Sequence, residues 1–157
     1  MIRNATTEDA QSIHELHTRS VRSLCKDHYS EEQITAWLTG RTPEGYRGIA
    51  RNEMFVFEDD EGIKGFGHAI AGEILAIFVD PESINQGIGT DILKYAIKLA
   101  TTDQTCFVKL KSTLNASGFY SQFGFKIVGK GSEQNGPYLI MENKFNEANV
   151  AEPYQCC

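Results

Sequence analysis

One stretch of the chain, Glu73 to Leu93, constrains the fold most, because it predicts a strand, a glycine loop and a helix in direct succession. The apolar run from Ile74 to Val79 is typical of a buried strand, and Pro81 ends it. After Gly87-Ile88-Gly89, apolar residues recur at helical spacing. The N–H groups of a first helical turn have no partner within the helix, and glycines let an anion approach them closely. The stretch therefore predicts a phosphate site at the start of this helix.

Spacing argues against two common nucleotide sites. A Walker loop requires G-x-x-x-x-G-K-[ST], and this string occurs nowhere in the chain. A Rossmann fingerprint places its first glycine directly after the strand, whereas several residues separate Val79 from Gly87. Ile92 stands where its third glycine belongs. A nucleotide-binding module built on Gly87 and Gly89 is kept as an alternative.

Two segments together resemble one family. Residues Ile84 to Gly89 resemble the pyrophosphate loop of the GNAT acyl-CoA N-acetyltransferases, [Gln/Arg]-x-x-Gly-x-[Gly/Ala], although Ile84 stands at the Gln/Arg position. Residues Ser112 to Phe125 resemble the family's N-A-x-x-F-Y-x-x-x-G-F segment. The string H-Y-S-x-x-Q-I-x-x-W from His28 to Trp37 resembles one from a bacterial branch of the family.

The resemblance implies an α+β fold with a central, mostly antiparallel twisted sheet of about seven strands and helices on both faces. The order of elements along the sequence agrees with such a mixed architecture. A chain of 157 residues is most simply one domain. We expect a single domain over residues 1–146 and a C-terminal tail over residues 147–157.

Several element boundaries can be predicted from local sequence. Thr7 is placed to cap a first helix that ends near His28. Ser30-Glu31-Glu32-Gln33 has the form of a capping box that opens a second helix. Near the end of the chain, residues 126–128 and 138–141 predict two strands that flank a loop.

The resemblance also implies acetyl-CoA as cosubstrate. In relatives, backbone N–H groups of the strand before the loop contact the pantetheine arm and the thioester oxygen, and a preorganised N–H stabilises a developing oxyanion. Asn115 matches a shorter variant of the second motif, N-A-x-x-F-Y. The positions that correspond to cofactor-binding residues are Ile77, Phe78, Val79, Ile84, Asn85, Gln86, Gly87, Ile88, Gly89, Thr90 and Asn115.

Acyl transfer from a thioester to an amine needs a base for the amine proton and gains from an acid at the departing sulfur. In the family a tyrosine at the position of Tyr120 commonly protonates that sulfur, which makes Tyr120 the predicted acid; a packing role is its alternative. Glu73 is the predicted base, because a glutamate opens this strand in lysine-acetylating relatives. A solvated turn residue is the alternative for Glu73, and His68 or water could serve instead.

The acceptor side of such a site usually involves the first two helices and the last strand loop. This places His28, Tyr29, Trp37 and the loop of residues 129–137 as candidates for binding a primary amine of a small molecule or peptide. For Trp37 an anchoring role in its helix is the alternative. Ile84 and the absence of an unambiguous base also keep open a non-catalytic acyl-CoA-binding or regulatory protein.

Composition sets further expectations. A formal net charge of -6 and the absence of a dense Lys/Arg cluster argue against nucleic-acid binding. No run of 18 apolar residues and no signal-peptide core are present, so we expect a cytoplasmic protein that does not bind membranes. The four cysteines include no C-x-x-C pair, so we expect no metal and free thiols at Cys25 and Cys106. The sequence assigns no role to Cys156 and Cys157. It is compatible with a homodimer and with a monomer.

Overall fold

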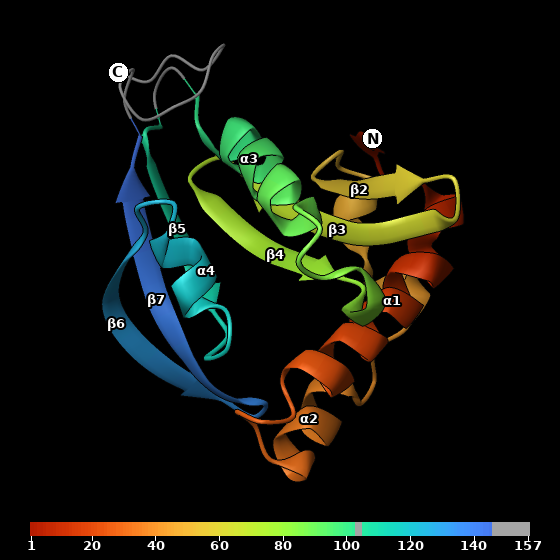
Figure 1. The fold of residues 1–157 in the computed structure, drawn as a ribbon, viewed down its shortest axis with the longest axis horizontal. Helices are drawn as coiled ribbons and strands as arrows, with labels where there is room; N and C mark the ends of the chain where they lie inside the picture. The colour runs from red at the N-terminus through yellow and green to blue at the C-terminus, as the bar shows by residue number, and fades with distance from the viewer. Residues whose placement is uncertain (103–104, 146–157) are drawn as a thin grey trace.

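The computed structural model describes residues 1–102 and 105–145, and within them the strands form one seven-stranded sheet in the order β1-β2-β3-β4-β5-β7-β6 (Figure 1). Neighbouring strands are antiparallel except β4 and β5, which are parallel. This arrangement confirms the predicted α+β fold. The strands are β1 (Ile2–Asn4), β2 (Met54–Asp59), β3 (Gly62–Ile70), β4 (Glu73–Val79), β5 (Phe107–Ser112), β6 (Lys126–Glu133) and β7 (Gly136–Lys144).

Helices cover both faces of the sheet, as predicted (Figure 1). The α-helices are α1 (Ala10–Leu24), α2 (Glu31–Leu38), α3 (Ile88–Ala100) and α4 (Ser117–Ser121), and the 3-10 helices are η1 (Thr7–Asp9), η2 (Pro43–Gly45), η3 (Arg47–Ile49) and η4 (Pro81–Ser83). α3 and α4 share one hydrophobic cluster with the sheet, whereas α1 packs on the opposite face. The neighbouring residues Phe55 and Val56 belong to these two different clusters and are both fully buried. Among the described residues, no helix is long and apolar enough to cross a membrane.

The first helix differs from its predicted bounds at both ends. Thr6, not Thr7, precedes the helical segment, and the Asp9 carboxylate accepts hydrogen bonds from the Thr6 N–H and hydroxyl. At the other end α1 stops at Leu24. The N–H groups of His28 and Tyr29 both bond to the Cys25 carbonyl in a turn, so the prediction of a helix as far as His28 is wrong.

The capping box of the second helix is confirmed. The Gln33 N–H donates to the Ser30 hydroxyl at 3.1 Å, and the Ser30 N–H donates to the Gln33 side-chain oxygen at 3.0 Å. The flanking residues Tyr29 and Ile34 are buried in one cluster, which is the contact expected of a hydrophobic staple. The box therefore fixes where the chain turns from α1 into α2.

The loop predicted over residues 129–137 is wrong. β6 and β7 extend through most of it and pair from Lys126 opposite Glu142 to Glu133 opposite Gly136, which leaves a turn of residues 134–135. β6 lies at the edge of the sheet, and all its residues are exposed or partly exposed. Such a strand carries no alternation of apolar and polar residues, so the sequence pattern could not reveal it.

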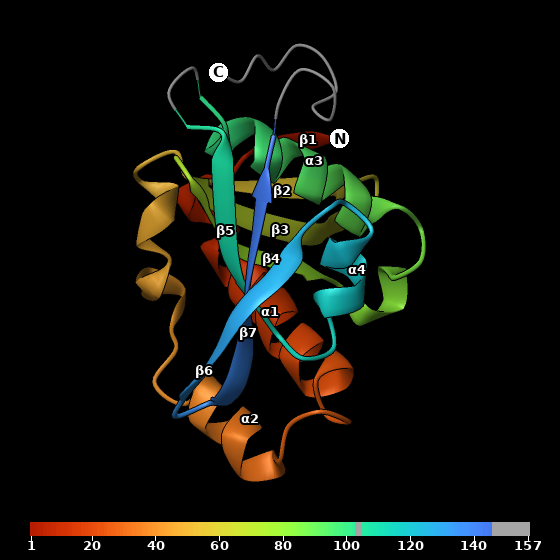
Figure 2. The ribbon, with the colours of Figure 1, turned by 90° about the vertical axis from the view of Figure 1, so that its left-hand side faces the viewer.

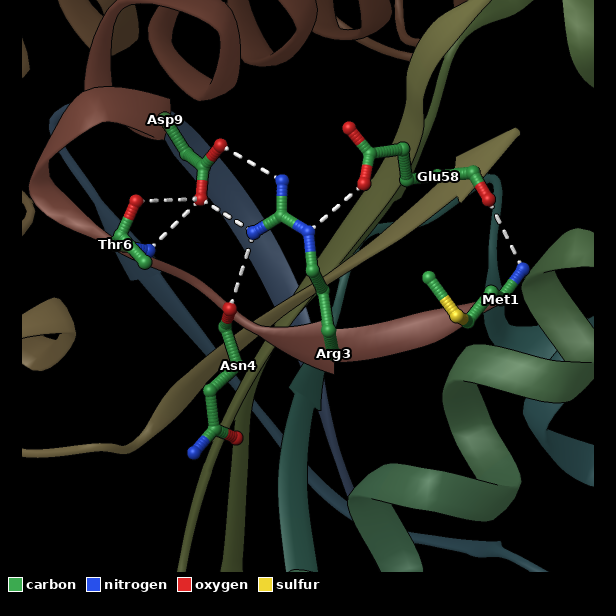
Figure 3. Close-up of polar contacts among 6 residues, drawn as sticks. All are labelled: Met1, Arg3, Asn4, Thr6, Asp9 and Glu58. Carbon is green, nitrogen blue, oxygen red and sulfur yellow. Dashed lines mark hydrogen bonds and ion pairs between the residues drawn. The ribbon is translucent and has the colours of Figure 1, made fainter. Parts of the chain in front are cut away.

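An ionic network fixes the N-terminal strand (Figure 3). The Arg3 guanidinium donates to both oxygens of Asp9 at 2.8 and 3.0 Å and to Glu58 at 2.8 Å. The N-terminal ammonium donates to the Glu58 carbonyl at 2.9 Å. Hydrogen bonding from Arg3 lowers the pKa of Asp9 below its usual value. The network thereby joins β1, β2 and the start of the first helical segment.

The cysteine expectations are met in part. Cys25 is a buried free thiol, and burial raises its pKa to about 11. Cys106 is disulfide-bonded, so the expectation of a free thiol there is wrong. The absence of a C-x-x-C motif excludes only a pair of cysteines that are neighbours in the sequence. A disulfide needs two cysteines that are close in the folded chain, which the sequence does not show. Cys156, Cys157 and the predicted tail of residues 147–157 lie outside the described residues.

Candidate active site

The sheet opens between its two parallel strands. β4 and β5 pair only where Glu73 lies opposite Lys109 and Ile74 opposite Leu110. In Figure 2, β5 and β7 run steeply across the direction of β2 and β3. Beyond Ile74, the edge of β4 that faces β5 has no strand partner in the described chain. Its backbone groups are therefore available to a ligand between the strands.

A β-bulge in β4 lies next to this opening. Ile74 pairs with Ala69 and Ala76 pairs with His68, so Leu75 has no partner on β3. The extra residue reverses the faces to which later side chains point. After the bulge, Ala76 packs with the α1 cluster, although Ile74 packs with the α3 cluster.

A cavity of about 550 Å³, called here the loop cavity, lies beside the glycine loop, β4 and α4. Of the predicted cofactor-binding residues, Ile77, Phe78, Val79, Ile84, Asn85, Gly87, Gly89, Thr90 and Asn115 line it. Gln86 and Ile88 do not. The Gln86 side chain is exposed, and Ile88 is buried in the α3 cluster.

The start of α3 has the geometry of an anion site. Gly87 has a φ of +82°, a left-handed conformation that favours glycine, and nothing lies within 4 Å of the position its Cβ would take. The Asp91 N–H donates to the Gly87 carbonyl. The preceding N–H groups, of Ile88, Gly89 and Thr90, thus lack a partner within the helix. This helix end can bind the oxygens of a phosphate group.

An ion pair supports the same loop from α1. Asp80 follows β4, and its carboxylate accepts hydrogen bonds from the Arg19 guanidinium at 2.6 Å and from the Glu82 N–H at 3.1 Å. Although burial opposes ionisation, these hydrogen bonds lower the pKa of Asp80 below its usual value. Asp80 therefore remains charged and holds the segment between β4 and α3 against α1.

A second cavity of about 360 Å³ lies on the α1 and α2 side of the opening, and we call it the aromatic cavity. Tyr29 and Trp37 line it, as predicted for acceptor-binding residues. His28 is exposed and lines neither cavity. The Tyr29 hydroxyl donates to the Pro137 carbonyl at 2.7 Å and accepts from the Leu114 N–H at 3.1 Å. These bonds join the α1–α2 turn to β7 and to the segment that follows β5, on the far side of the opening.

Tyr120 stands where the two cavities meet. It lines both, together with Ile77, Phe78, Thr113 and Ala116. Its side chain is 6% exposed, and burial raises its pKa above the usual value. The phenol is therefore protonated near neutral pH. Its hydroxyl has no hydrogen-bond partner among residues 1–102 and 105–145, which leaves it able to donate to a ligand.

The two base candidates occupy different places. Glu73 opens β4 but lines neither cavity, whereas His68 lines the aromatic cavity. The His68 imidazole Nε2 lies 2.8 Å from a carboxylate oxygen of Glu53. Gly48 packs so closely on the ring that a Cβ there would lie 2.7 Å from Nε2. Because a carboxylate only accepts, this contact assigns the Nε2 proton to His68, and in the neutral imidazole Nδ1 then carries the lone pair.

Three further residues of the aromatic cavity were missed in the sequence. His17 of α1 lies 2.8 Å from the Arg41 guanidinium and 3.1 Å from the Tyr46 hydroxyl, both contacts through Nδ1. Burial and the charge of Arg41 lower the pKa of His17 to about 3. A lone histidine on an amphipathic helix and an arginine in a connection carry no recognisable sequence signal. Their relation exists only in the folded chain.

Comparisons with known proteins agree with this geometry. The sequence matches the family model of an acetyltransferase (GNAT) domain over residues 25–142. It is 36% identical over 145 residues to the peptidyl-lysine N-acetyltransferase YjaB of Salmonella typhimurium, a match that covers 89% of this chain and 94% of that protein. It is 28% identical over 127 residues to the uncharacterized N-acetyltransferase YafP of Escherichia coli, with 81% of each covered.

A solved structure supports the same assignment. The PaiA N-acetyltransferase of Thermoplasma acidophilum, in complex with coenzyme A, matches with a TM-score of 0.76 and 26% identity over 92% of this chain and 98% of that chain. The fold, the family model and the curated relatives thus converge, and the chain belongs to the GNAT family of acetyltransferases.

Proposed function

We propose that the protein transfers the acetyl group of acetyl-CoA to a primary amine of a small molecule or peptide, by direct attack within a ternary complex. The observation that carries the proposal is the meeting of the loop cavity and the aromatic cavity at Tyr120. One cavity has the anion-binding helix end that a pyrophosphate requires, and the other is a separate space for the acceptor. Both substrates can therefore be present at once.

Acetyl-CoA fits the loop cavity by the chemistry of its lining. The unpaired N–H groups at the start of α3 would bind the pyrophosphate, and the uncovered edge of β4 at Ile77 to Val79 would bind the pantetheine arm. Ile84 supplies no polar side chain here, so the backbone carries most of the recognition. When bound, acetyl-CoA supplies an activated thioester.

The residues at the junction supply the remaining chemistry. A backbone N–H of Ile77 to Val79, aimed at the thioester oxygen, would stabilise the negative charge that develops when the amine attacks. Tyr120 would donate its proton to the departing sulfur, so that the C–S bond breaks as the C–N bond forms and coenzyme A leaves as the thiol. Solvent then returns a proton to Tyr120.

The amine must lose a proton before or during its attack. We propose His68, held by Glu53, as the group that accepts it, because His68 lines the cavity and its Nδ1 can accept. Glu73 remains the alternative and would have to act through water, since it lines neither cavity.

Acetyl transfer can be tested directly with the purified protein. Release of the coenzyme A thiol would be followed against small amines, polyamines and lysine peptides, with a reaction lacking acceptor as the control. Calorimetry would measure coenzyme A binding separately. We expect binding and turnover with at least one amine class. Binding without turnover on any amine would favour the alternative of a non-catalytic acyl-CoA-binding protein.

A cytoplasmic location also belongs to the proposal.

A further inference from the structure

The charges around the aromatic cavity are predominantly basic, although the chain as a whole carries a formal net charge of -6. The residues with fully charged side chains that line it are Arg41, Arg47, Lys111 and Glu133. Lys111 and Glu133 form an ion pair at 2.9 Å and offset one another. Two guanidinium groups thus remain on the cavity wall without a charge partner lining the same space.

Arg41 is held in place on this wall. It lies between α2 and η2, where its guanidinium donates to His17 Nδ1 at 2.8 Å and lies 5.8 Å from the centre of the Tyr46 ring. His17 is itself 4% exposed and packs on Phe78 with ring centres 4.2 Å apart. A neutral, buried imidazole is thus a rigid acceptor that orients the guanidinium, and the Tyr46 hydroxyl also accepts from Arg41. A guanidinium has five N–H donors, so donors remain for a ligand.

In the part of the chain that the structure describes, no acid neutralises the Arg41 guanidinium. Within residues 1–102 and 105–145, no carboxylate lies within 4.0 Å of Arg41 or Arg47. By contrast, Arg3 and Arg19 each have a carboxylate at 2.8 Å or less. An arginine that is half-buried, held in one orientation and without a carboxylate partner keeps its remaining N–H donors for a ligand oxyanion.

We propose that the amine acceptor carries an anionic oxygen group, a carboxylate or phosphoryl, and that Arg41 binds it within the aromatic cavity. The inference deepens the proposed function and rests on it for the identity of the cavity as the acceptor site. The anion at Arg41 fixes one end of the acceptor, so that its amine can reach the junction at Tyr120. A purely cationic acceptor would meet two uncompensated positive charges instead.

The amine of the acceptor must be neutral to react, whereas its anionic group stays charged. The two groups of the acceptor therefore have separate roles. Arg41 recognises a charge that does not change during the reaction, and the base near the junction takes the proton from the amine. Such an arrangement distinguishes amino acids and related amino oxyanions from polyamines, which have only positive groups.

Binding can be tested without catalysis, because Trp37 is the single tryptophan of the chain and lines the aromatic cavity. Its fluorescence would be followed while N-acetylated amino acids and an N-acetylated aminophosphonate are added to the protein saturated with coenzyme A, at constant ionic strength. Coenzyme A occupies the other anion site, so it removes that site from the titration. Each carboxylate probe is paired with its uncharged amide.

We expect the anionic probes to bind roughly tenfold or more tightly than the amides. The carboxylate and phosphonate probes show which oxyanion is preferred. In Arg41→Gln this advantage should be lost, whereas Arg51→Gln, which removes an exposed arginine outside the aromatic cavity, should keep it. Arg41→Lys retains the charge without the planar donor set and should give an intermediate result. Thermal unfolding and coenzyme A affinity check each variant.

Equal binding of acids and amides, no binding of any acid probe, or an advantage that survives in Arg41→Gln would each overturn the inference. Rates of acetyl transfer to amino acids and to their amides distinguish a failure of this inference from a failure of the proposed function. The amine of the amide loses its proton more readily, so a preference for the acid must come from its carboxylate. Transfer without such a preference contradicts the inference alone, whereas oxyanion binding without transfer to any amine contradicts the proposed function alone.

Discussion

Tyr120 combines a largely buried ring with a hydroxyl that no protein group within residues 1–102 and 105–145 uses. It is 6% exposed, and its hydroxyl has no partner in the described part of the chain. The hydroxyl is not among the buried polar atoms that lack a partner, and the residue lines both cavities, so a ligand there can reach it. The ring packs against Phe119 and Phe125, which explains its orientation but not its free hydroxyl. A ligand at the junction would complete the missing bond.

Tyr120→Phe should test this role, because it removes the hydroxyl and keeps the ring packing. We expect coenzyme A affinity to change little and the single-turnover rate of acetyl transfer to fall by about two to four orders of magnitude. Single-turnover measurement excludes product release as the limiting step. A folded variant with a near-normal rate on a verified acceptor would show that the tyrosine is structural.

The base can be identified with the matched variants His68→Gln and Glu73→Gln. In the variant that lacks the base, the single-turnover rate should fall most at low pH, where little amine is already neutral, and should recover in part as pH rises. We expect this behaviour from His68→Gln and a nearly unchanged profile from Glu73→Gln. The reverse result would assign the base to Glu73. If the pH–rate profiles of both variants were unchanged, water would be the group that accepts the proton.

At the scale of elements, the start of α3 and the opening between β4 and β5 act together. The helix provides unpaired N–H groups at its first turn, and β4 provides an edge without a strand partner. Neither feature depends on a particular polar side chain. The departure at Ile84 from the family pattern therefore changes one side chain and leaves these backbone features in place.

Gly89→Glu should abolish coenzyme A binding while the protein remains folded. The Cβ position of Gly89 lies 3.6 Å from Phe119 and Val79, an ordinary contact, so the side chain can be accommodated. Its carboxylate would occupy the anion site and repel a pyrophosphate. Calorimetry measures the affinity, and Gly118→Glu, which adds the same charge outside both cavities, is the control. Undiminished affinity in a folded Gly89→Glu variant would place the pyrophosphate elsewhere.

At the scale of the whole molecule, the two cavities exist because the sheet divides into two parts that stay connected. One part consists of β1 to β4, and the other of β5 to β7 (Figure 1). Tyr29 bridges them through its bonds to Pro137 and Leu114. At the far edge, the Arg3 network fixes β1 to its neighbours (Figure 3). The stability of the sheet edge should therefore depend on pH.

The sign of that dependence follows from Asp9, whose pKa is lowered by Arg3 in the folded protein. Its contribution to stability is fully present above the unfolded pKa of about 3.9 and is lost as pH falls through the lower folded value. Arg3→Gln should thus lower the free energy of unfolding at pH 7 by about 1 to 2 kcal/mol, and the difference from wild type should shrink below pH 4. Urea unfolding at both pH values measures it, with Arg51→Gln as the control. A difference independent of pH would contradict the assignment.

The sequence by itself determined the features that depend on neighbouring residues. The strand, the glycine loop and α3 follow from local periodicity and from the left-handed conformation that glycine permits at Gly87. The capping box at Ser30 was likewise predictable, because both partners lie within one turn. The resemblance to the family then implied one mostly antiparallel sheet of about seven strands, whereas the order of the strands is known only from the structure.

Only the tertiary structure decided which residues share a space. It ended α1 at Leu24, since the following turn is needed to bring Tyr29 to Pro137 and Leu114. It also separated His28 and Glu73 from the cavities and brought His17 to Arg41. These relations join segments distant in the chain, and their energies depend on distance and burial in the folded state. A linear pattern contains neither quantity, so it can indicate the helix proposed to bind a phosphate but not the arginine proposed to bind the acceptor.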